Sequence, residues 1–352
     1  MALTVGVIGC GEISRFHFAG LEKAGARVAW VCDVNEKVTG PLAARFNARA
    51  TKDYREVLGD PAVEAVWVLT FSTNHKEICL AAIAAGKAVV CEKTLATNPQ
   101  DALEIVTAAR ARGIVFFTSY MKRFMPAVEK AKELMPRLGM ILTTHIRAHQ
   151  CWGDVWTAPG SFLKPSGDQP SPCRSRLGGG ILLAGGSHIL DLMNHLIGRP
   201  DTVFAHLTTP TGSDVDGLAA AMFTGPNGVV HWEAIMHGHT RVGYLRDGWD
   251  ERVEIVGSAG RLEILSNEWN HFDTKAALCI HYDNATETST EYRFAPVSPF
   301  ARAVAAFSAD IEAKRQTVQS VLTGYDVDEM IGAIQTSAAA GREATIPWQM
   351  GE

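Results

Sequence analysis

The hydrophobic pattern of the first third of the chain predicts strands that alternate with helices. Five short runs are continuously apolar, at residues 5–8, 28–31, 65–69, 88–90 and 115–117. A strand has such a run only when both faces of its sheet are covered, so these runs predict a parallel sheet between helices. Helical spacing predicts helices over 78–85 and 99–112, each ending at a capping glycine, Gly86 or Gly113. The pattern indicates a doubly wound α/β Rossmann domain.

The pattern changes after residue 122. A helix is expected over 126–138, a strand over 141–148 and a helix near 187–197, with a long Pro-, Gly- and Ser-rich loop over 151–180 that we interpret as functional. Further strands are predicted at 203–207, 219–223, 229–235, 252–256 and 261–265, and turn sequences between some of them favour antiparallel pairing. We therefore expect a Rossmann domain at 1–122 and an α+β domain at 123–352, with a large, mostly antiparallel open sheet and C-terminal helices at about 299–341.

Composition narrows the class of partner. The 352 residues are 47% hydrophobic and 20% charged with a net charge of −5, which suits two packed domains and gives no basic field for nucleic acid or an anionic membrane. A small-molecule ligand is expected instead. The N-terminal residues lack a basic leader, no apolar run reaches about 18 residues, and the seven cysteines form no CxxC pair. We expect no signal peptide, no membrane span and a cytoplasmic location.

The strongest local motif is the sequence GCGEIS at residues 9–14, which follows a predicted strand and opens a predicted helix. Glycines there permit a tight turn and close approach of a pyrophosphate to the helix N-terminus. Asp33 ends the next strand, where its carboxylate would accept hydrogen bonds from the adenosine ribose and repel a 2′-phosphate. NAD is therefore expected, and NADP less so. The alternatives are a vestigial fold and a merely solvated Asp33.

Five further stretches carry a resemblance to a known family. They are STNH at 72–75, CEKT at 91–94, YMKRF at 120–124, GGILLAGGSHILD at 179–191 and WDERVEIVG at 249–257. In this order along the chain they resemble the glucose-fructose oxidoreductase, inositol dehydrogenase and MocA family over nearly the whole chain. The resemblance implies an NAD(P)-dependent oxidoreductase that acts on CH–OH groups. Its substrate would be the secondary alcohol or ketone carbon of a sugar, cyclitol or glycoside.

The resemblance also implies the catalytic pair. The family's Glu-Lys-Pro lysine and its later histidine correspond to Lys93 and His188. Hydride transfer from an alcohol requires the hydroxyl proton to leave, so we expect His188 as the base and Lys93 as oxyanion stabiliser or proton relay. Thr94 replaces the family's proline, which removes a restriction on the Lys93 backbone. Ala184 stands where inositol dehydrogenases have an aspartate, which weakens a strict inositol dehydrogenase assignment.

Two sets of site residues follow. Expected cofactor ligands are Gly9, Gly11, Glu12, Ile13, Asp33, Thr70, Asn74, His75, Glu92 and Lys93. Expected substrate ligands are Lys93, Tyr120, Met121, Arg123, Trp156, Arg176, His188, Asp191 and Trp249. Several structural alternatives stay open: a surface Lys93, a helix-start His188, an orienting Asp191, a core Trp249 and an Arg123 that binds the domain junction together. The histidine pairs lack a convincing third ligand, so no metal is expected.

Two other functions compete with the dehydrogenase. A glycoside-cleaving enzyme on the same framework would oxidise a sugar carbon transiently and keep its NAD bound and unconsumed. A non-catalytic NAD-binding regulator would need neither Lys93 nor His188. The open sheet of the second domain is expected to be covered by another copy of the chain, because an exposed apolar face lowers solubility. The family resemblance thus favours a dimer or a tetramer.

Overall fold

The computed structural model describes residues 2–153, 179–211 and 213–351. It forms two compact units: Met1–Met121 with Pro299–Asp328 and Met350–Glu352, and Lys122–Ser298 with Glu329–Gln349. The expected division put the whole of 123–352 into the second domain. Residues 299–328 instead belong to the first unit, because a C-terminal helix packs against its first helix.

The sheet of the first unit is six-stranded and parallel throughout. Its order, β3-β2-β1-β4-β5-β6, reverses direction between β1 and β4, and ligands of such sheets bind outside the carboxyl ends of the strands at that switch point. The third strand was not predicted, since its short sequence has no apolar run. The strands are β1 Thr4–Ile8, β2 Arg27–Cys32, β3 Arg49–Thr51, β4 Ala65–Val68, β5 Ala88–Cys91 and β6 Phe116–Thr118.

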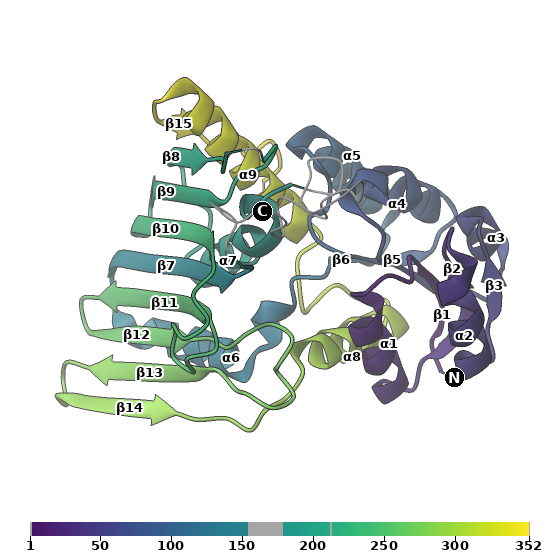
Figure 1. Cartoon of the computed structure of the whole chain (residues 1–352), viewed down its shortest axis with the longest axis horizontal. Coiled ribbons are helices and arrows are strands. Elements are labelled where there is room, and N and C mark those ends of the chain that lie inside the picture. Colours follow the sequence, from purple (N-terminus) through teal and green to yellow (C-terminus); the bar gives the residue numbers. More distant parts are fainter. Residues whose placement is uncertain (1, 154–178, 212, 352) are drawn as a thin grey trace. The chain divides into compact units, whose positions relative to one another are not determined.

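Helices flank this sheet on both sides in Figure 1. Gly86 and Gly113 have φ of +72° and +62°, as expected for glycines that end helices. The first helix packs closely on α8, where a Cβ at Gly20 would lie 2.8 Å from Val304 Cβ. The helices are α1 Ser14–Lys23, α2 Glu36–Phe46, α3 Tyr54–Gly59, α4 His75–Ala84, α5 Pro99–Arg112 and α8 Pro299–Glu312, and the 3-10 turn η1 is Ser72–Asn74.

The second unit contains a nine-stranded sheet in the order β14-β13-β12-β11-β7-β10-β9-β8-β15. Its neighbours pair antiparallel except β7 and β10, which are parallel, so the mostly antiparallel sheet is confirmed. The last three strands were missed; β14 is exposed and polar. The strands are β7 Ile141–Cys151, β8 Thr202–Thr208, β9 Leu218–Gly225, β10 Gly228–His237, β11 Trp249–Gly257, β12 Gly260–Leu265, β13 Leu278–Asp283, β14 Thr288–Tyr292 and β15 Ala344–Thr345.

In the described part of the chain, helices cover one face of this sheet and leave the other open (Figure 1). The covering elements include α6 Pro126–Leu134, α7 Ser187–Leu196 and the π-helical turn η5 Leu182–Gly186. The last helix, α9 Thr323–Ala340, is divided between the two units. A helix over 126–138 was predicted, and the structure ends α6 at Leu134 and continues in the 3-10 turn Met135–Leu138. None of the helices in the described ranges is long and apolar enough to cross a membrane.

We expect His195 on α7 to make the protein less stable in mild acid. Burial, with the positive charges of Arg123 and Lys132, lowers the pKa of His195 from 6.5 to about 3. At a pH between these two values, His195 binds a proton in the unfolded chain but not in the folded chain. The contribution of His195 to stability is therefore full above pH 6.5 and is lost as the pH falls toward 3. His195→Gln should flatten the dependence of Tm on pH between 7.5 and 5, measured by calorimetry.

The matched control is His271→Gln, since the His271 side chain is 47% exposed outside the sheet and should leave the slope as it is. An unchanged slope in His195→Gln would contradict the assignment.

Candidate active site

The glycine loop after β1 has an open side. Gly9 has φ +93°, and a Cβ there would lie 2.6 Å from the carbonyl carbon of Leu69, so only glycine fits. A Cβ at Gly11, in contrast, would meet no atom of the described chain within 4 Å. Among the described residues, no side chain caps the N-terminus of α1, which begins at Ser14. A helix N-terminus without a side-chain cap, beside an open glycine, fits a pyrophosphate.

Asp33, directly after β2, is held by the backbone in an orientation suited to a ribose. Its Oδ2 accepts a hydrogen bond from the Cys10 N–H at 2.7 Å, and its Oδ1 accepts one from the Asn35 N–H at 2.9 Å. Because a carboxylate has about four acceptor positions, both oxygens keep capacity for two hydroxyl donors. Asp33 is partly exposed, so a ligand can reach it. These residues fit an adenosine ribose with free hydroxyl groups.

Two of the expected cofactor residues offer their backbone more than their side chains. Glu12 is exposed and pairs with Arg15 at 3.8 Å, and Ile13 is partly buried at the start of α1. Two exposed apolar residues that the motif analysis did not name follow the carboxyl ends of β2 and β4, the strands on either side of β1. Val34 follows Asp33 and is 83% exposed, and Phe71 follows Thr70 and is 56% exposed. In the sequence, the signal that could have identified them is an apolar residue placed just after the end of a predicted strand, where a loop begins.

Glu92, at the end of β5, is buried and fully partnered. Its Oε1 lies 2.9 Å from Nε2 of His17 on α1, and its Oε2 accepts from the Lys93 N–H at 3.0 Å. Burial raises the pKa of the Glu92 carboxyl, but the hydrogen bond from His17 and the charges of His17 and Lys93 lower it below its usual value. Glu92 is thus a buried anion that ties the lysine segment to α1. Its side chain holds the backbone of Lys93, and the expected contact of Glu92 with the cofactor stays a prediction.

His75 joins two loops of the same sheet edge. Its imidazole is fully buried, with Nδ1 2.8 Å from the Thr94 carbonyl oxygen and Nε2 2.9 Å from that of Thr70. Burial lowers the pKa of His75, and the two carbonyl groups and Glu92 raise it only in part. A neutral imidazole has one N–H and donates to one of these oxygens at a time. His75 therefore links the two loops, its expected contact with the cofactor stays a prediction, and Asn74 before it is exposed.

Lys93 is partly exposed between two anchored neighbours. Glu92 holds its backbone N–H, and His75 contacts the carbonyl group of Thr94. The peptide bond between Lys93 and Thr94 is cis. Thr94, which replaces the family's proline, donates its hydroxyl to the Ala96 carbonyl oxygen at 2.9 Å. The backbone that carries Lys93 is consequently fixed on both sides.

In the second unit His188 is the second residue of α7 and is partly exposed. The π-helical turn before it is capped by Asp216, whose Oδ2 accepts from the Leu182 N–H at 2.8 Å and whose carbonyl oxygen accepts from the Ile181 N–H at 3.0 Å. Burial raises the pKa of Asp216, and these hydrogen bonds lower it only partly. Ala184 lies inside this turn, so a methyl group stands at the family's aspartate position.

Asp191 and Arg123 form a bidentate ion pair. The Arg123 Nε donates to both carboxylate oxygens at 3.0 and 2.9 Å, and its Nη2 donates to Oδ1 at 2.7 Å. The Asp191 side chain is completely buried and that of Arg123 is 12% exposed. Of the two roles left open for Asp191, orienting the helix agrees with this geometry better than contact with substrate.

The remaining expected substrate residues divide into three groups. Tyr120 and Met121 are buried, with 0% and 1% exposure, which differs from the expected lining of a cleft. Trp249 is 3% exposed and meets the edge of Trp152, with ring centroids 5.6 Å apart. Trp156 and Arg176 lie outside the described residues. In the described part of the chain, no three His, Cys, Asp or Glu side chains are grouped so that they could hold a metal ion.

Comparison with known proteins identifies the family. The model described as "Oxidoreductase family, NAD-binding Rossmann fold" matches residues 3–120, and the GFO/IDH/MocA C-terminal domain model matches residues 131–263. Inositol 2-dehydrogenase 2 of Saccharopolyspora erythraea is 31% identical over 275 residues, which are 75% of this chain and 74% of that protein. The chain belongs to the GFO/IDH/MocA oxidoreductase family.

Other members of the family agree in sequence and fold. Levoglucosan dehydrogenase of Pseudarthrobacter phenanthrenivorans is 28% identical over 74% of this chain and 73% of its own. The solved structure of a levoglucosan dehydrogenase in complex with NADH and levoglucosan has a TM-score of 0.81 and covers 99% of this chain and 100% of its own, at 23% identity. The structural likeness establishes the fold. The chain is therefore an oxidoreductase whose first unit is an NAD-binding Rossmann domain.

Asp33→Asn should weaken NADH binding and reduce discrimination against NADPH. The substitution removes the negative charge that repels a 2′-phosphate and weakens one charge-assisted hydrogen bond. We expect the Kd for NADH to rise about 10-fold and the ratio of NADPH to NADH Kd to fall, measured by calorimetric titration. Glu36→Gln, an exposed acidic residue of α2, is the matched control. Equal NADH affinity in Asp33→Asn and wild type would refute the role of Asp33.

Proposed function

We propose that this protein is an NAD-dependent dehydrogenase or ketoreductase that acts on a secondary alcohol or ketone carbon of a sugar, cyclitol or glycoside. The observation that carries the proposal is Lys93, whose backbone is fixed by buried Glu92 at the carboxyl end of β5. Relatives named for inositol and levoglucosan support the substrate class. His188 at the start of α7 supplies the second group that the family resemblance assigns to the reaction.

The chemistry divides between cofactor and chain. NAD, when bound, supplies the hydride acceptor, held by the Gly11 loop, the N-terminus of α1 and the Asp33 carboxylate. His188 accepts the proton of the substrate hydroxyl at a ring nitrogen, and the Lys93 ammonium stabilises the oxyanion that remains. In the reduction of a ketone the same groups return the proton. Val34 and Phe71 offer apolar surface for the planar adenine ring.

Ala184 limits the substrate further. An aspartate at this position would contact substrate and support the histidine, whereas a methyl group accepts no hydrogen bond. We infer that the substrate is a sugar, cyclitol or glycoside other than the usual one of inositol 2-dehydrogenases. The glycoside-cleaving and regulatory alternatives remain outcomes of the experiment below.

Lys93→Met and His188→Ala should each abolish turnover while the cofactor still binds. A panel of inositols, hexoses, glycosides and their keto forms would be screened for NADH absorbance with the wild type and both variants. We expect kcat to fall at least about 100-fold in each variant, the usual contribution of an acid–base group, with the NADH Kd little changed in His188→Ala. Lys37→Ala, an exposed lysine of α2, should react as the wild type.

The outcomes separate the candidate functions. Stoichiometric NADH from one substrate, lost in both variants, supports the dehydrogenase. Cleavage of a glycoside without net NADH would favour transient oxidation, and bound NAD without turnover of any substrate would favour a regulator.

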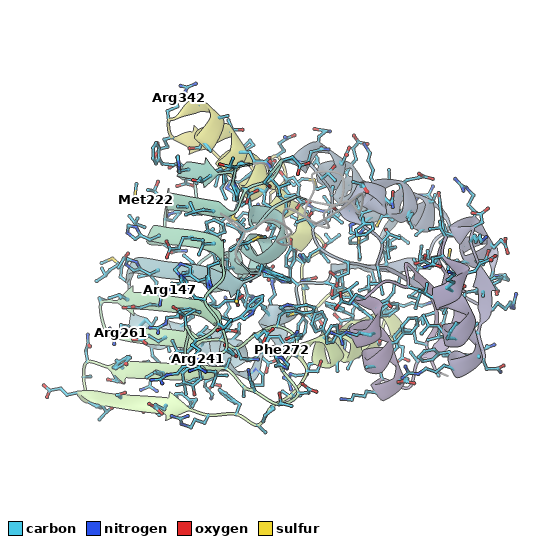
Figure 2. All side chains as sticks on the ribbon, viewed as in Figure 1. Arg147, Met222, Arg241, Arg261, Phe272 and Arg342 are labelled. Carbon is cyan, nitrogen blue, oxygen red and sulfur yellow. The ribbon has the colours of Figure 1, made fainter. Side chains whose placement is uncertain are left out.

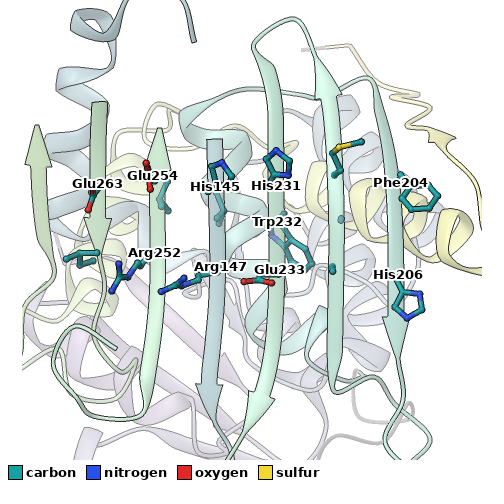
Figure 3. Close-up of a pocket in the computed structure, with 16 residues that line it drawn as sticks. His145, Arg147, Phe204, His206, His231, Trp232, Glu233, Arg252, Glu254 and Glu263 are labelled. Carbon is teal, nitrogen blue, oxygen red and sulfur yellow. The ribbon is translucent and has the colours of Figure 1, made fainter. Parts of the chain in front are cut away.

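We also propose that the open face of the nine-stranded sheet binds a second copy of the chain. A hollow of about 520 Å³ lies on this face. Phe204 and Met222 are 46% and 40% exposed on adjacent strands, and the rings of His145 and His231 stack with centroids 4.6 Å apart (Figure 3). Figure 2 shows Met222 and Arg147 on the side away from α6 and α7.

Charge on the open face suits self-association. The acidic Glu254 and Glu263 lie opposite each other on β11 and β12, and the basic Arg147 and Arg252 lie opposite each other on β7 and β11. A face that carries both signs beside exposed apolar side chains can complement a copy of itself across a two-fold axis. A dimer or tetramer built on this face is therefore the assembly we propose.

The double variant Phe204→Glu with Met222→Glu should release a monomer. Two carboxylates placed on the apolar part of the face would repel those of a facing copy and cost their desolvation. Light scattering after size-exclusion chromatography would give the mass. Val318→Glu, at a 37% exposed apolar residue of the first unit, is the control and should leave the assembly intact. A wild type that is monomeric, or a double variant of unchanged mass, would rule out this interface.

The cysteines support the proposed cytoplasmic location. The six described cysteines are free thiols, and Cys173 lies outside the described residues. Burial, followed by the charge of Asp33, raises the pKa of Cys10 and of Cys32 to about 12. Neutral buried thiols of this kind are typical of proteins in a reducing compartment.

A further inference from the structure

A chain of buried polar side chains in the second unit runs from Lys122 to Trp152. Lys122, Glu251 and Gln150 are only 2%, 3% and 2% exposed. The Lys122 ammonium donates to Glu251 Oε2, and Glu251 Oε1 accepts from the Gln150 Nε2 at 2.7 Å. The Gln150 Oε1 in turn accepts from the Trp152 indole N–H at 2.8 Å. The catalytic chemistry proposed above uses none of these groups.

The available hydrogen-bond donors and acceptors determine which way the side-chain amide of Gln150 is oriented. The Glu251 carboxylate, beside the ammonium of Lys122, only accepts, so it must face the NH₂ group of Gln150. The indole N–H of Trp152 only donates, so it must face the carbonyl oxygen of the same amide. The Gln150 amide therefore has one permitted orientation, which transmits the position of the buried Glu251 to the indole.

Gln150 also contacts the segment that leads into His188. A Cβ at Gly185 would lie 2.4 Å from both Nε2 and Oε1 of Gln150. The amide consequently lies flat against the backbone of the π-helical turn Leu182–Gly186, two residues before the proposed base. The turn thus limits the positions open to the amide, so a side chain at position 150 that lacks its hydrogen bonds displaces the indole.

Trp152 is the partly exposed end of this series of hydrogen-bonded side chains. Its ring meets Trp249 edge to face, with centroids 5.6 Å apart and an interplanar angle of 67°. Trp249 is 3% exposed and fixed on β11, whereas Trp152 is only partly buried. Aromatic faces of this kind pack against the C–H groups of sugar and cyclitol rings.

We propose that Trp152 is a substrate-binding residue that packs on the C–H face of the substrate ring, and that Gln150 is the positioning residue that fixes it, held by Glu251 and Lys122. The inference rests on the proposed function, since it names how that site recognises a polyol or sugar ring. It assigns binding to Trp152 and an indirect role to Gln150. The effect should therefore appear in KM more than in kcat.

A double-mutant cycle tests the connection between the two residues. Gln150→Met removes both hydrogen bonds, and Trp152→Ala removes the aromatic face. Each should raise the KM of the substrate found in the panel by about 10-fold, the size of one lost hydrogen bond or stacking contact. Gln150→Met should add little in the Trp152→Ala background, because its effect acts through the indole. Gln316→Met, at a partly buried glutamine of the first unit, is the control for loss of a hydrogen-bonded amide.

Gln150→Glu provides a pH signature. With a proton bound, the carboxyl group at position 150 donates to Glu251 and accepts from Trp152, as the amide does. Without that proton two carboxylates share one ammonium, and the mutual repulsion raises the pKa of the pair. We expect KM near that of the wild type at about pH 5.5 and raised about 10-fold at pH 8, with Gln150→Met raised at both.

Indole N–H resonances give a readout that does not need turnover. In protein labelled with [15N]tryptophan, the Trp152 signal is identified by its loss in Trp152→Phe. It should shift in Gln150→Met, and in Gln150→Glu it should return toward the wild-type position as the pH falls. Additive KM effects in the cycle, or a Trp152 signal that Gln150→Met leaves unmoved, would overturn the inference. If the wild type turns over no member of the panel, the proposed function fails, and the resonance still decides whether Gln150 positions Trp152.

Discussion

The buried carboxylate of Glu92 is the constraint on which the first unit's site depends. A buried anion is tolerated only when its oxygens are partnered, and here one oxygen takes the imidazole of His17 and the other the N–H of Lys93. Loss of one partner from such a buried pair costs about 3–5 kcal/mol, so α1 and the end of β5 are strongly coupled. The helix that begins at the pyrophosphate loop thereby fixes the backbone of the lysine. His75 adds a second link between the loops after β4 and β5.

The second unit applies the same rule at Glu251. That carboxylate is also buried and takes one partner per oxygen, Lys122 and Gln150. Asp191 is a third buried carboxylate, bonded to Arg123 through both oxygens. In each case the acid was placed within or beside a recognised motif, yet its side chain serves to orient a neighbour. Because a buried charge must be paired, each of these carboxylates fixes the position of its partner. The more exposed groups beside them can then bind ligands.

The sequence predicted the elements whose patterns are strong. The five apolar strands, the capped helix Pro99–Arg112 and the antiparallel strands up to Leu265 all appear. Strands β3 and β14 were missed because they lie at sheet edges, where exposure removes the apolar signal. The motif residues were located, but their hydrogen-bond partners were not, because donor and acceptor matching depends on tertiary contacts. Glu92 pairs with His17, and Gln150 pairs with Glu251, across separations of about 70 to 130 positions in the sequence. Pairs so far apart leave no signal in the local sequence pattern.

The departure at Ala184 shows why family roles transfer residue by residue and not as a set. Of the two positions on this helical segment where a carboxylate could assist His188, 184 carries a methyl group and Asp191 is committed to Arg123. A substrate hydroxyl that faced position 184 would lose an acceptor and remain unsolvated, at a cost of about 1–3 kcal/mol. A ring that presents C–H groups there loses nothing. The proposed site would thus discriminate against a fully hydroxylated ring in that orientation, and an aromatic face at Trp152 would favour the same C–H surface.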